Sequence, residues 1–184
     1  EVEPCSGGEA EIAAAWDRGG RELQLARIAG LSPYGKELAP QIERRLGDLE
    51  ARWAAQHRDA CVAHRRGAQS PLLLDRRMAC LARGRVALAA VADIAGSAVA
   101  ETLPEVARAV TAIPDPGACG DLAALASDVE PAPPGLAAPI ASARADVERS
   151  RVHLAAGRAA TAREIANRAL ASARSIAYRP LVAE

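Results

Sequence analysis

Apolar side chains between residues 38 and 61 recur at steps of three and four along the chain. The stripe consists of Leu38, Ile42, Leu46, Leu49, Trp53 and, two turns later, Cys61. This spacing puts the side chains on one face of an α-helix, where they can pack against a core. The sequence therefore predicts a long helix over about residues 40–66, with Pro40 in the first turn, where its missing N–H costs nothing.

Residues 66–71 (RGAQSP) predict a turn, after which a second long helix begins. Ser70 and Pro71 fit the N-cap and the first helical position. The apolar stripe of this second helix consists of Leu74, Met78, Leu81, Leu88 and Val91. Gly96 marks its expected end, so the two helices form a hairpin.

Shorter helices are predicted on both sides of this hairpin. The first begins at a capping box formed by Ser6 and Glu9, and it is expected to end at Gly19 and Gly20. The others are an amphipathic piece with Leu23, Leu25 and Ile28 that stops at Gly30, a helix over residues 103–113, and a brief helix capped by Asp121.

The core must be built from alanine and leucine, because aromatic residues make up only 2% of the chain and Phe is absent. Small side chains fill a core only where backbones approach closely. This favours packed helices, and strand-forming residues are sparse. We therefore predict an all-α fold, an irregular helical bundle of five or six helices followed by a helical hairpin. Trp16 and Trp53 are expected to anchor the core rather than to form a ligand cage.

Residues 130–139 (EPAPPGLAAP) separate the chain into two parts. Four prolines in ten residues make an extended, semi-rigid connector. A helical pair is predicted beyond it, over residues 140–156 and 159–176. The expected organisation is a helical domain at 1–129, the connector at 130–139, and a second unit at 140–184.

Charge and hydropathy narrow the classes of partner. Lys plus Arg and Asp plus Glu number 23 each, so there is no basic excess of the kind that nucleic-acid binding requires. No apolar stretch approaches the roughly 20 residues that span a bilayer. The abrupt start EVEPC and an end within helical sequence suggest a fragment, so a membrane is expected only through a span outside it.

The four cysteines include no C-x-x-C pair, which argues against a thioredoxin-like site. We favour two disulfides, Cys61–Cys80 across the helical hairpin and Cys5–Cys119 from the N-terminus to a later loop. A stagger of about one helical turn in the hairpin would bring Cys61 and Cys80 within bridging distance. Four cysteines allow three pairings, so the assignment is a choice among them. Disulfides would imply an oxidising compartment.

Two other states of the cysteines stay open. His57, Cys61 and His64 lie at i, i+4 and i+7 on one helix face, and with Cys80 they could form a Cys2His2 zinc set. This spacing matches no common zinc module. The thiols could also be free and packed as small hydrophobic groups.

No catalytic constellation is predicted. Cys61, His64 and Asp59 share a helix, but an i, i+3 placement does not orient an imidazole onto a thiol. Two pairs of carboxylates, Glu9 with Glu11 and Asp48 with Glu50, are interpreted as solvated charges. Asp75, Arg76 and Arg77 are interpreted as a salt-bridged helix surface, in preference to buried ion pairs or a ligand pocket. We therefore assign no catalytic, cofactor-binding or metal-binding residue, and the ligand-binding residues stay unknown.

Four segments carry a likeness to a known family. They are CSGGEAEIAAAWD (residues 5–17), ACVAHRRGAQSPLLLDRRMACL (60–81), ACGDLAAL (118–125) and YRPLVAE (178–184). Together they resemble the extracytoplasmic region of large bacterial Hanks-type serine/threonine protein kinases. In that family a kinase domain precedes one membrane span, a cysteine-containing helical region and tetratricopeptide repeats.

The kinase's own motifs, a Gly-rich loop, H-R-D and D-F-G, do not occur, so this chain is not expected to transfer phosphoryl groups. The resemblance implies a non-catalytic extracytoplasmic sensor or protein-interaction domain of a membrane-anchored kinase, without a cofactor. Binding of a protein partner or a small ligand would regulate the linked kinase, and a homodimer is a further option. The alternative is a structural adaptor that caps a tetratricopeptide array and has no ligand of its own.

The final helical pair separately resembles a tetratricopeptide unit. Gly157, Ala162 and Ala169 have the spacing of that repeat's small residues, and residues 178–184 would begin the next repeat. A single repeat needs neighbours to cover its apolar face. We therefore expect a truncated array whose first repeat docks on the preceding helices.

Overall fold

The computed structural model describes residues 5–126, 133, 135–176 and 178–183. All regular elements in these ranges are helices, which confirms the all-α prediction. The N-terminal bundle contains α1 (Gly8–Ala13), α2 (Arg18–Leu31), α3 (Pro33–Arg65), α4 (Pro71–Gly96), the 3-10 helix η1 (Ala100–Thr102), α5 (Leu103–Thr111), the 3-10 helix η2 (Pro116–Gly120) and α6 (Leu122–Ala126). The C-terminal part contains α7 (Ala137–Ala156), α8 (Ala159–Ile176) and α9 (Arg179–Ala183).

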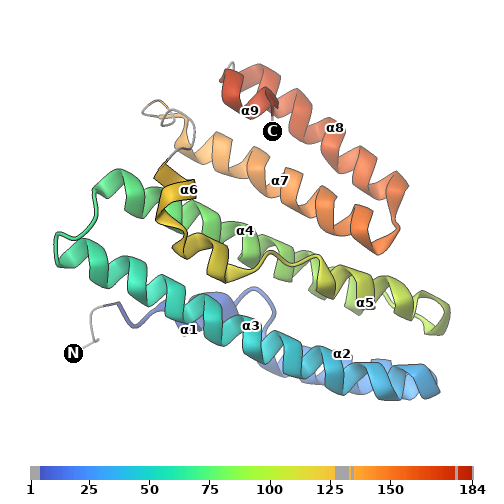
Figure 1. The fold of residues 1–184 in the computed structure, drawn as a ribbon. Helices are drawn as coiled ribbons and strands as arrows, with labels where there is room; N and C mark the ends of the chain where they lie inside the picture. The colour runs from blue at the N-terminus through green and yellow to red at the C-terminus, as the bar shows by residue number, and fades with distance from the viewer. Residues whose placement is uncertain (1–4, 127–132, 134, 177, 184) are drawn as a thin grey trace.

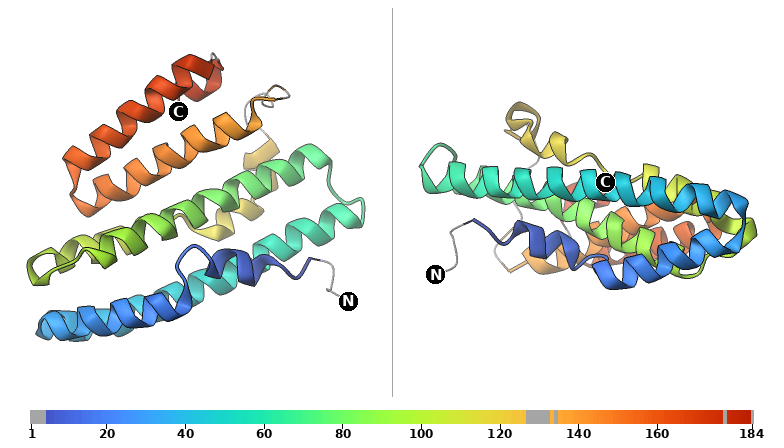
Figure 2. Two further views of the ribbon diagram at one scale, coloured as in Figure 1. Left: turned by 180° about the vertical axis from the view of Figure 1, so that it is seen from behind. Right: turned by 90° about the horizontal axis from the view of Figure 1, so that it is seen from below.

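The helices are arranged in layers around the antiparallel pair α3 and α4 (Figure 1). Helices α1 and α2 pack on α3, whereas α7 packs on α4 and α5. Helix α8 covers the far side of α7, so that α7 lies between the bundle and the last helices (Figure 2). The expected docking of the C-terminal hairpin on the preceding helices is therefore observed.

Helix α3 begins at Pro33, well before the predicted start near Pro40, which lies inside the helix. Ser32 is the N-cap, and its Oγ accepts a hydrogen bond of 3.1 Å from the Gly35 N–H. The corner between α2 and α3 is tight, since a Cβ at Gly35 would collide with the Ile28 carbonyl oxygen. The prediction missed this start because Pro33 and Pro40 both suit the first turn of a helix. Only the packing at the corner between α2 and α3 distinguishes them.

The two N-terminal helices also differ from the prediction. Helix α1 has Gly7 at its N-cap, so the capping box expected from Ser6 and Glu9 does not start this helix. Gly19 and Gly20 do not end a helix but lie in the first turn of α2. The Asp17 carboxylate caps α2 by accepting a hydrogen bond of 2.9 Å from the Gly20 N–H.

The core confirms the expectation of alanine, leucine and two tryptophans. Trp16 and Trp53 are 4% and 1% exposed, and the Trp53 Nε1–H donates to the Leu81 carbonyl at 2.8 Å. The fully buried alanines of the bundle include Ala60, Ala87, Ala95 and Ala109. A close approach of α4 to Trp53 occurs at Gly84, where a Cβ would lie 3.5 Å from the indole. Small residues thus let the long helices close around one large ring.

The C-terminal hairpin docks through one end of α7. Val152 and Ala156 are fully buried in the bundle core. The Arg108 guanidinium on α5 donates to the Ala156 carbonyl at 2.8 Å, and Arg158 pairs with Glu105 at 2.7 Å. The predicted connector falls partly on residues 130–132 and 134, which lie outside the described ranges. Its last three residues, 137–139, belong to α7.

Candidate functional site

All four cysteines form disulfides, but the pairing differs from the one favoured by the sequence. Cys5 is bonded to Cys61, and Cys80 is bonded to Cys119, with Cα atoms 5.6 Å apart in both bridges. The predicted pairs Cys61–Cys80 and Cys5–Cys119 are therefore wrong. The two bridges favour an oxidising setting outside the cytosol.

The register of α3 against α4 explains the error. Trp53 contacts the Leu81 carbonyl, and Arg77 contacts Asp59, so Cys80 lies opposite the turn of α3 that follows Trp53. Cys61 is then about 9 Å further along the helix axis, at 1.5 Å per residue. The stagger that the predicted bridge needed does not occur. Instead η2 packs against both long helices and brings Cys119 to Cys80.

The zinc and nucleophile hypotheses are excluded by the same bridges. Cys61 has no free thiol, and no group of three or more His, Cys, Asp or Glu among the described residues could hold a metal ion. The His57 ring stacks on Trp53 with centroids 5.3 Å apart, and its Nε2 lies 3.5 Å from the Glu11 carboxylate. His57 is therefore a packing residue between α1 and α3.

Arg77 is a buried ion-pair residue, which the sequence had left as the less favoured interpretation. Its side chain is 2% exposed and donates to the Asp59 carboxylate at 2.6 Å. The list of its other acceptors comprises Gln56 Oε1 at 3.3 Å, Gln69 Oε1 at 3.2 Å and the Cys119 carbonyl at 3.2 Å. The guanidinium thus joins α3, α4 and η2 beside the Cys80–Cys119 bridge. With these partners it forms a structural network.

The neighbouring charges have separate roles. Arg76 donates to the Leu125 carbonyl of α6 at 2.8 Å, whereas Asp75 is exposed. A second buried cation, Arg21 on α2, pairs with Glu50 and with Glu43 on α3. Sequence reasoning interpreted Glu50 as a solvated charge and missed Arg21. The spacing of Arg21 was the available signal, because it lies four and seven residues before Leu25 and Ile28, on the same helix face. A charge on the buried face of an amphipathic helix needs a partner.

A groove remains open along α7, α8 and α9, and it is the best candidate for a binding site. Its volume is about 290 Å³. The groove is lined by Val147 and Arg151 of α7, Asn167 and Leu170 of α8, and Leu181 and Val182 of α9, with alanines between them. The alanines form its floor because they let α7 and α8 approach closely. Ser150 Oγ donates to the Ala162 carbonyl across this contact at 2.8 Å.

The groove is apolar with one positive group at its edge. Arg151 is the single charged residue among the described residues that line it, and its side chain is 55% exposed. Its neighbour Glu148 is 3.4 Å away but almost completely buried. Leu170 and Val182 are 37% and 45% exposed, so apolar surface faces solvent here. Such a groove can hold apolar side chains next to a carboxylate.

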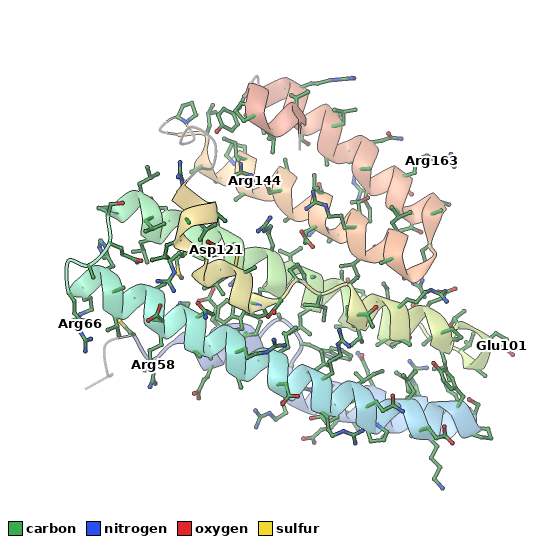
Figure 3. The ribbon with its side chains drawn as sticks, viewed as in Figure 1. Arg58, Arg66, Glu101, Asp121, Arg144 and Arg163 are labelled. Atoms are coloured by element: carbon green, nitrogen blue, oxygen red, sulfur yellow. A yellow bond between two sulfur atoms is a disulfide. The ribbon has the colours of Figure 1, made fainter. Side chains whose placement is uncertain are left out.

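Of the small residues singled out in the sequence, Ala169 lines this groove, whereas Gly157 and Ala162 lie outside it. Ala162 and Ala169 are buried between α7 and α8, and Gly157 has φ +94°, which ends α7 and lets the chain reverse. The sequence predicted that a further helix begins at residues 178–184. It did not predict that Tyr178 and Leu181 would be buried there. Arg144 marks α7 and Arg163 marks α8 in Figure 3.

His153 lies at the junction of α7 with α4. Partial burial lowers the pKa of its imidazole below the ordinary value of 6.5, and the positive charge of Arg158 lowers it further. The Asp93 carboxylate on α4 has the opposite, smaller effect on this pKa. The imidazole therefore favours its neutral form where the hairpin meets the bundle.

Comparisons with protein-family models, with curated protein sequences and with solved structures find no match to the chain. Among the described residues, no helix is both long enough and apolar enough to cross a membrane.

Proposed function

We propose that the chain is a non-catalytic extracytoplasmic sensor or protein-interaction domain of a membrane-anchored serine/threonine protein kinase. The link to a kinase depends on the resemblance of residues 5–17, 60–81, 118–125 and 178–184 to that family. The two disulfides support the extracytoplasmic location, because such bridges persist in oxidising compartments. Binding outside the membrane would regulate the linked kinase by changing how kinase chains associate.

The groove on α7, α8 and α9 is the observation that carries this proposal. At about 290 Å³ it suits two or three side chains of a polypeptide better than a whole drug-sized ligand. Its apolar walls and the exposed Arg151 match a segment in which apolar residues stand next to Asp or Glu. We therefore propose a protein partner that presents an acidic, apolar peptide.

Selection from a displayed random peptide library, with the disulfide-bonded protein as the target, tests the groove. Enriched peptides should combine apolar residues with a carboxylate. They should bind Arg151→Glu and Val182→Asp at least about tenfold more weakly, because each change removes one half of the complementarity. Leu23→Asp is the matched control, since Leu23 is 76% exposed on α2, outside the groove. Equal binding to all three variants would contradict the proposal.

The structural adaptor remains the second candidate, and the docking of α7 favours it. Val152 and Ala156 place one end of the hairpin in the bundle core, so the bundle covers a face that a first repeat would otherwise expose. The adaptor hypothesis predicts that library selection enriches no peptide. In the full-length protein, bound partners would then require the segment that follows residue 184.

Location can be tested separately from binding. Intact cells that express the full-length protein would be treated with a membrane-impermeant reductant and then with a membrane-impermeant maleimide. Labelling of the cysteines under these conditions supports an extracytoplasmic domain. Labelling only after the cells are permeabilised would contradict it.

A further inference from the structure

The two disulfides differ in access to solvent. Cys80 and Cys119 are 8% and 3% exposed, and both belong to the main core. Cys5 and Cys61 are both partly exposed, and they join the start of the described chain to the last part of α3. Figure 3 marks this end of α3 with Arg58 and Arg66. Thiol–disulfide exchange needs direct approach of a thiolate to a sulfur, so the two bridges are unequal substrates.

The partly exposed bridge restrains a short helix. Helix α1 has six residues, and its N-cap is Gly7, which has no side chain to accept a hydrogen bond. A helix of this length is not stable alone, so α1 depends on its contacts with α3. Cys5 itself has φ +72°, a backbone conformation that is unfavourable for a residue with a Cβ. The bridge thus holds both the helix and the unusual backbone in place.

Below α1 lies a contact that would open if the helix moved. A Cβ at Gly8 would lie 2.9 Å from His57 Nδ1, so the α1 backbone rests directly on the ring that stacks on Trp53. Glu11 connects α1 to Arg85 on α4 at 2.7 Å and to His57 at 3.5 Å. The Glu11–Arg85 contact is a partly exposed ion pair, which contributes little to stability.

We propose that Cys5–Cys61 is a site of thiol–disulfide exchange with a dithiol, and that it acts as a latch for α1. A thiolate of the dithiol attacks one sulfur of the bridge, which releases the other cysteine as a thiolate and forms a mixed disulfide. The second thiol of the reductant then attacks the mixed disulfide and releases the first cysteine. Two electrons and two protons pass from the dithiol to the protein, which gains two thiols while the reductant becomes a disulfide.

Opening of this latch leaves the rest of the bundle intact. Cys80–Cys119 is shielded, and the neighbouring Arg77 network holds η2 against α3 and α4 independently of Cys5. Reduction of the outer bridge therefore loosens the start of α1 over His57, while Ile12 and Trp16 remain packed in the core. The inference does not depend on the peptide groove, which lies on α7, α8 and α9.

A dithiothreitol titration of the oxidised protein tests the inference. Free thiols are trapped by alkylation and assigned by peptide mass spectrometry, while hydrogen exchange is followed on the same samples. Cys5 and Cys61 should be alkylated at a dithiothreitol concentration about tenfold below that needed for Cys80 and Cys119. Amides of α1 should then exchange about tenfold faster, whereas amides in the middle of α4 should not change.

Two double variants serve as controls. Cys5→Ala with Cys61→Ala should show fast α1 exchange without reductant and no further change when reductant is added. Cys80→Ser with Cys119→Ser should retain the low-concentration step of the titration. Reduction of both bridges together, or of Cys80–Cys119 first, would overturn the site. Unchanged α1 exchange after selective reduction would overturn the latch.

Discussion

Between α3 and α4 the packing centres on one large ring, whereas between α7 and α8 it depends on alanines. Trp53 fills the first contact, and the Arg77 network fixes the register around it. The two disulfides join α3 to Cys5 and α4 to η2. The second contact buries Ala143, Ala162, Ala169 and Ala173, with no covalent bridge among these helices. The bundle is therefore fixed from several directions, whereas the hairpin is attached at one end and leaves a groove open at the other.

The largest expected effect comes from removal of the ring. Trp53→Ala should lower the free energy of unfolding by about 4–5 kcal/mol, because it leaves a cavity and removes the hydrogen bond from the indole to the Leu81 carbonyl. Urea unfolding of the oxidised protein, followed by circular dichroism, measures this change. Leu23→Ala, at a residue 76% exposed, should change stability by less than about 0.5 kcal/mol. A loss below about 2 kcal/mol for Trp53→Ala would mean that the alanines alone specify the bundle.

A smaller and more local effect is expected at the attachment of the hairpin. Val152→Ala removes two buried methyl groups between α7 and the bundle, which should cost about 2 kcal/mol. Hydrogen exchange should accelerate in α7 and α8 but not in α3, because the disulfides and Trp53 remain. Leu154→Ala on the exposed face of α7 is the matched control. Equal acceleration in α3 would show that the two regions unfold as one unit.

The sequence predicted those features of the bundle that depend on local chemistry. Ser70 and Pro71 start α4 as expected, and Asp121 caps α6 by accepting a hydrogen bond from the Ala124 N–H at 3.0 Å. Helix α3 was placed too late because Ser32 with Pro33 and the later Pro40 offer similar local signals. The close approach of Gly35 to Ile28 decides between them, and that approach is a property of the folded chain.

The disulfide pairing and the groove could not be derived from local patterns for a related reason. The pairing depends on the axial register of α3 against α4, in which a shift of about 9 Å changes which cysteines meet. The groove depends on where α9 lies against α8. That position is known only from the folded structure, in which Leu181 of α9 is buried. Periodicity identifies the buried face of a helix, but the register between helices comes from side chains such as Trp53 and Arg77.

The smallest expected effect is a pH dependence at the attachment of the hairpin. Burial and Arg158 lower the pKa of His153 in the folded protein, against the opposing effect of Asp93. The unfolded chain then binds a proton more readily than the folded one, so this contribution to stability is complete above pH 6.5. It decreases as the pH falls through the lowered pKa, and it changes no further once both states are protonated. Urea unfolding at pH 7.5 and pH 5 should show a smaller loss for His153→Gln than for the natural sequence. Asp93→Asn should increase the loss, because it removes the one charge that raises this pKa. An identical loss in all three proteins would mean that the hairpin attachment does not respond to the charge of His153.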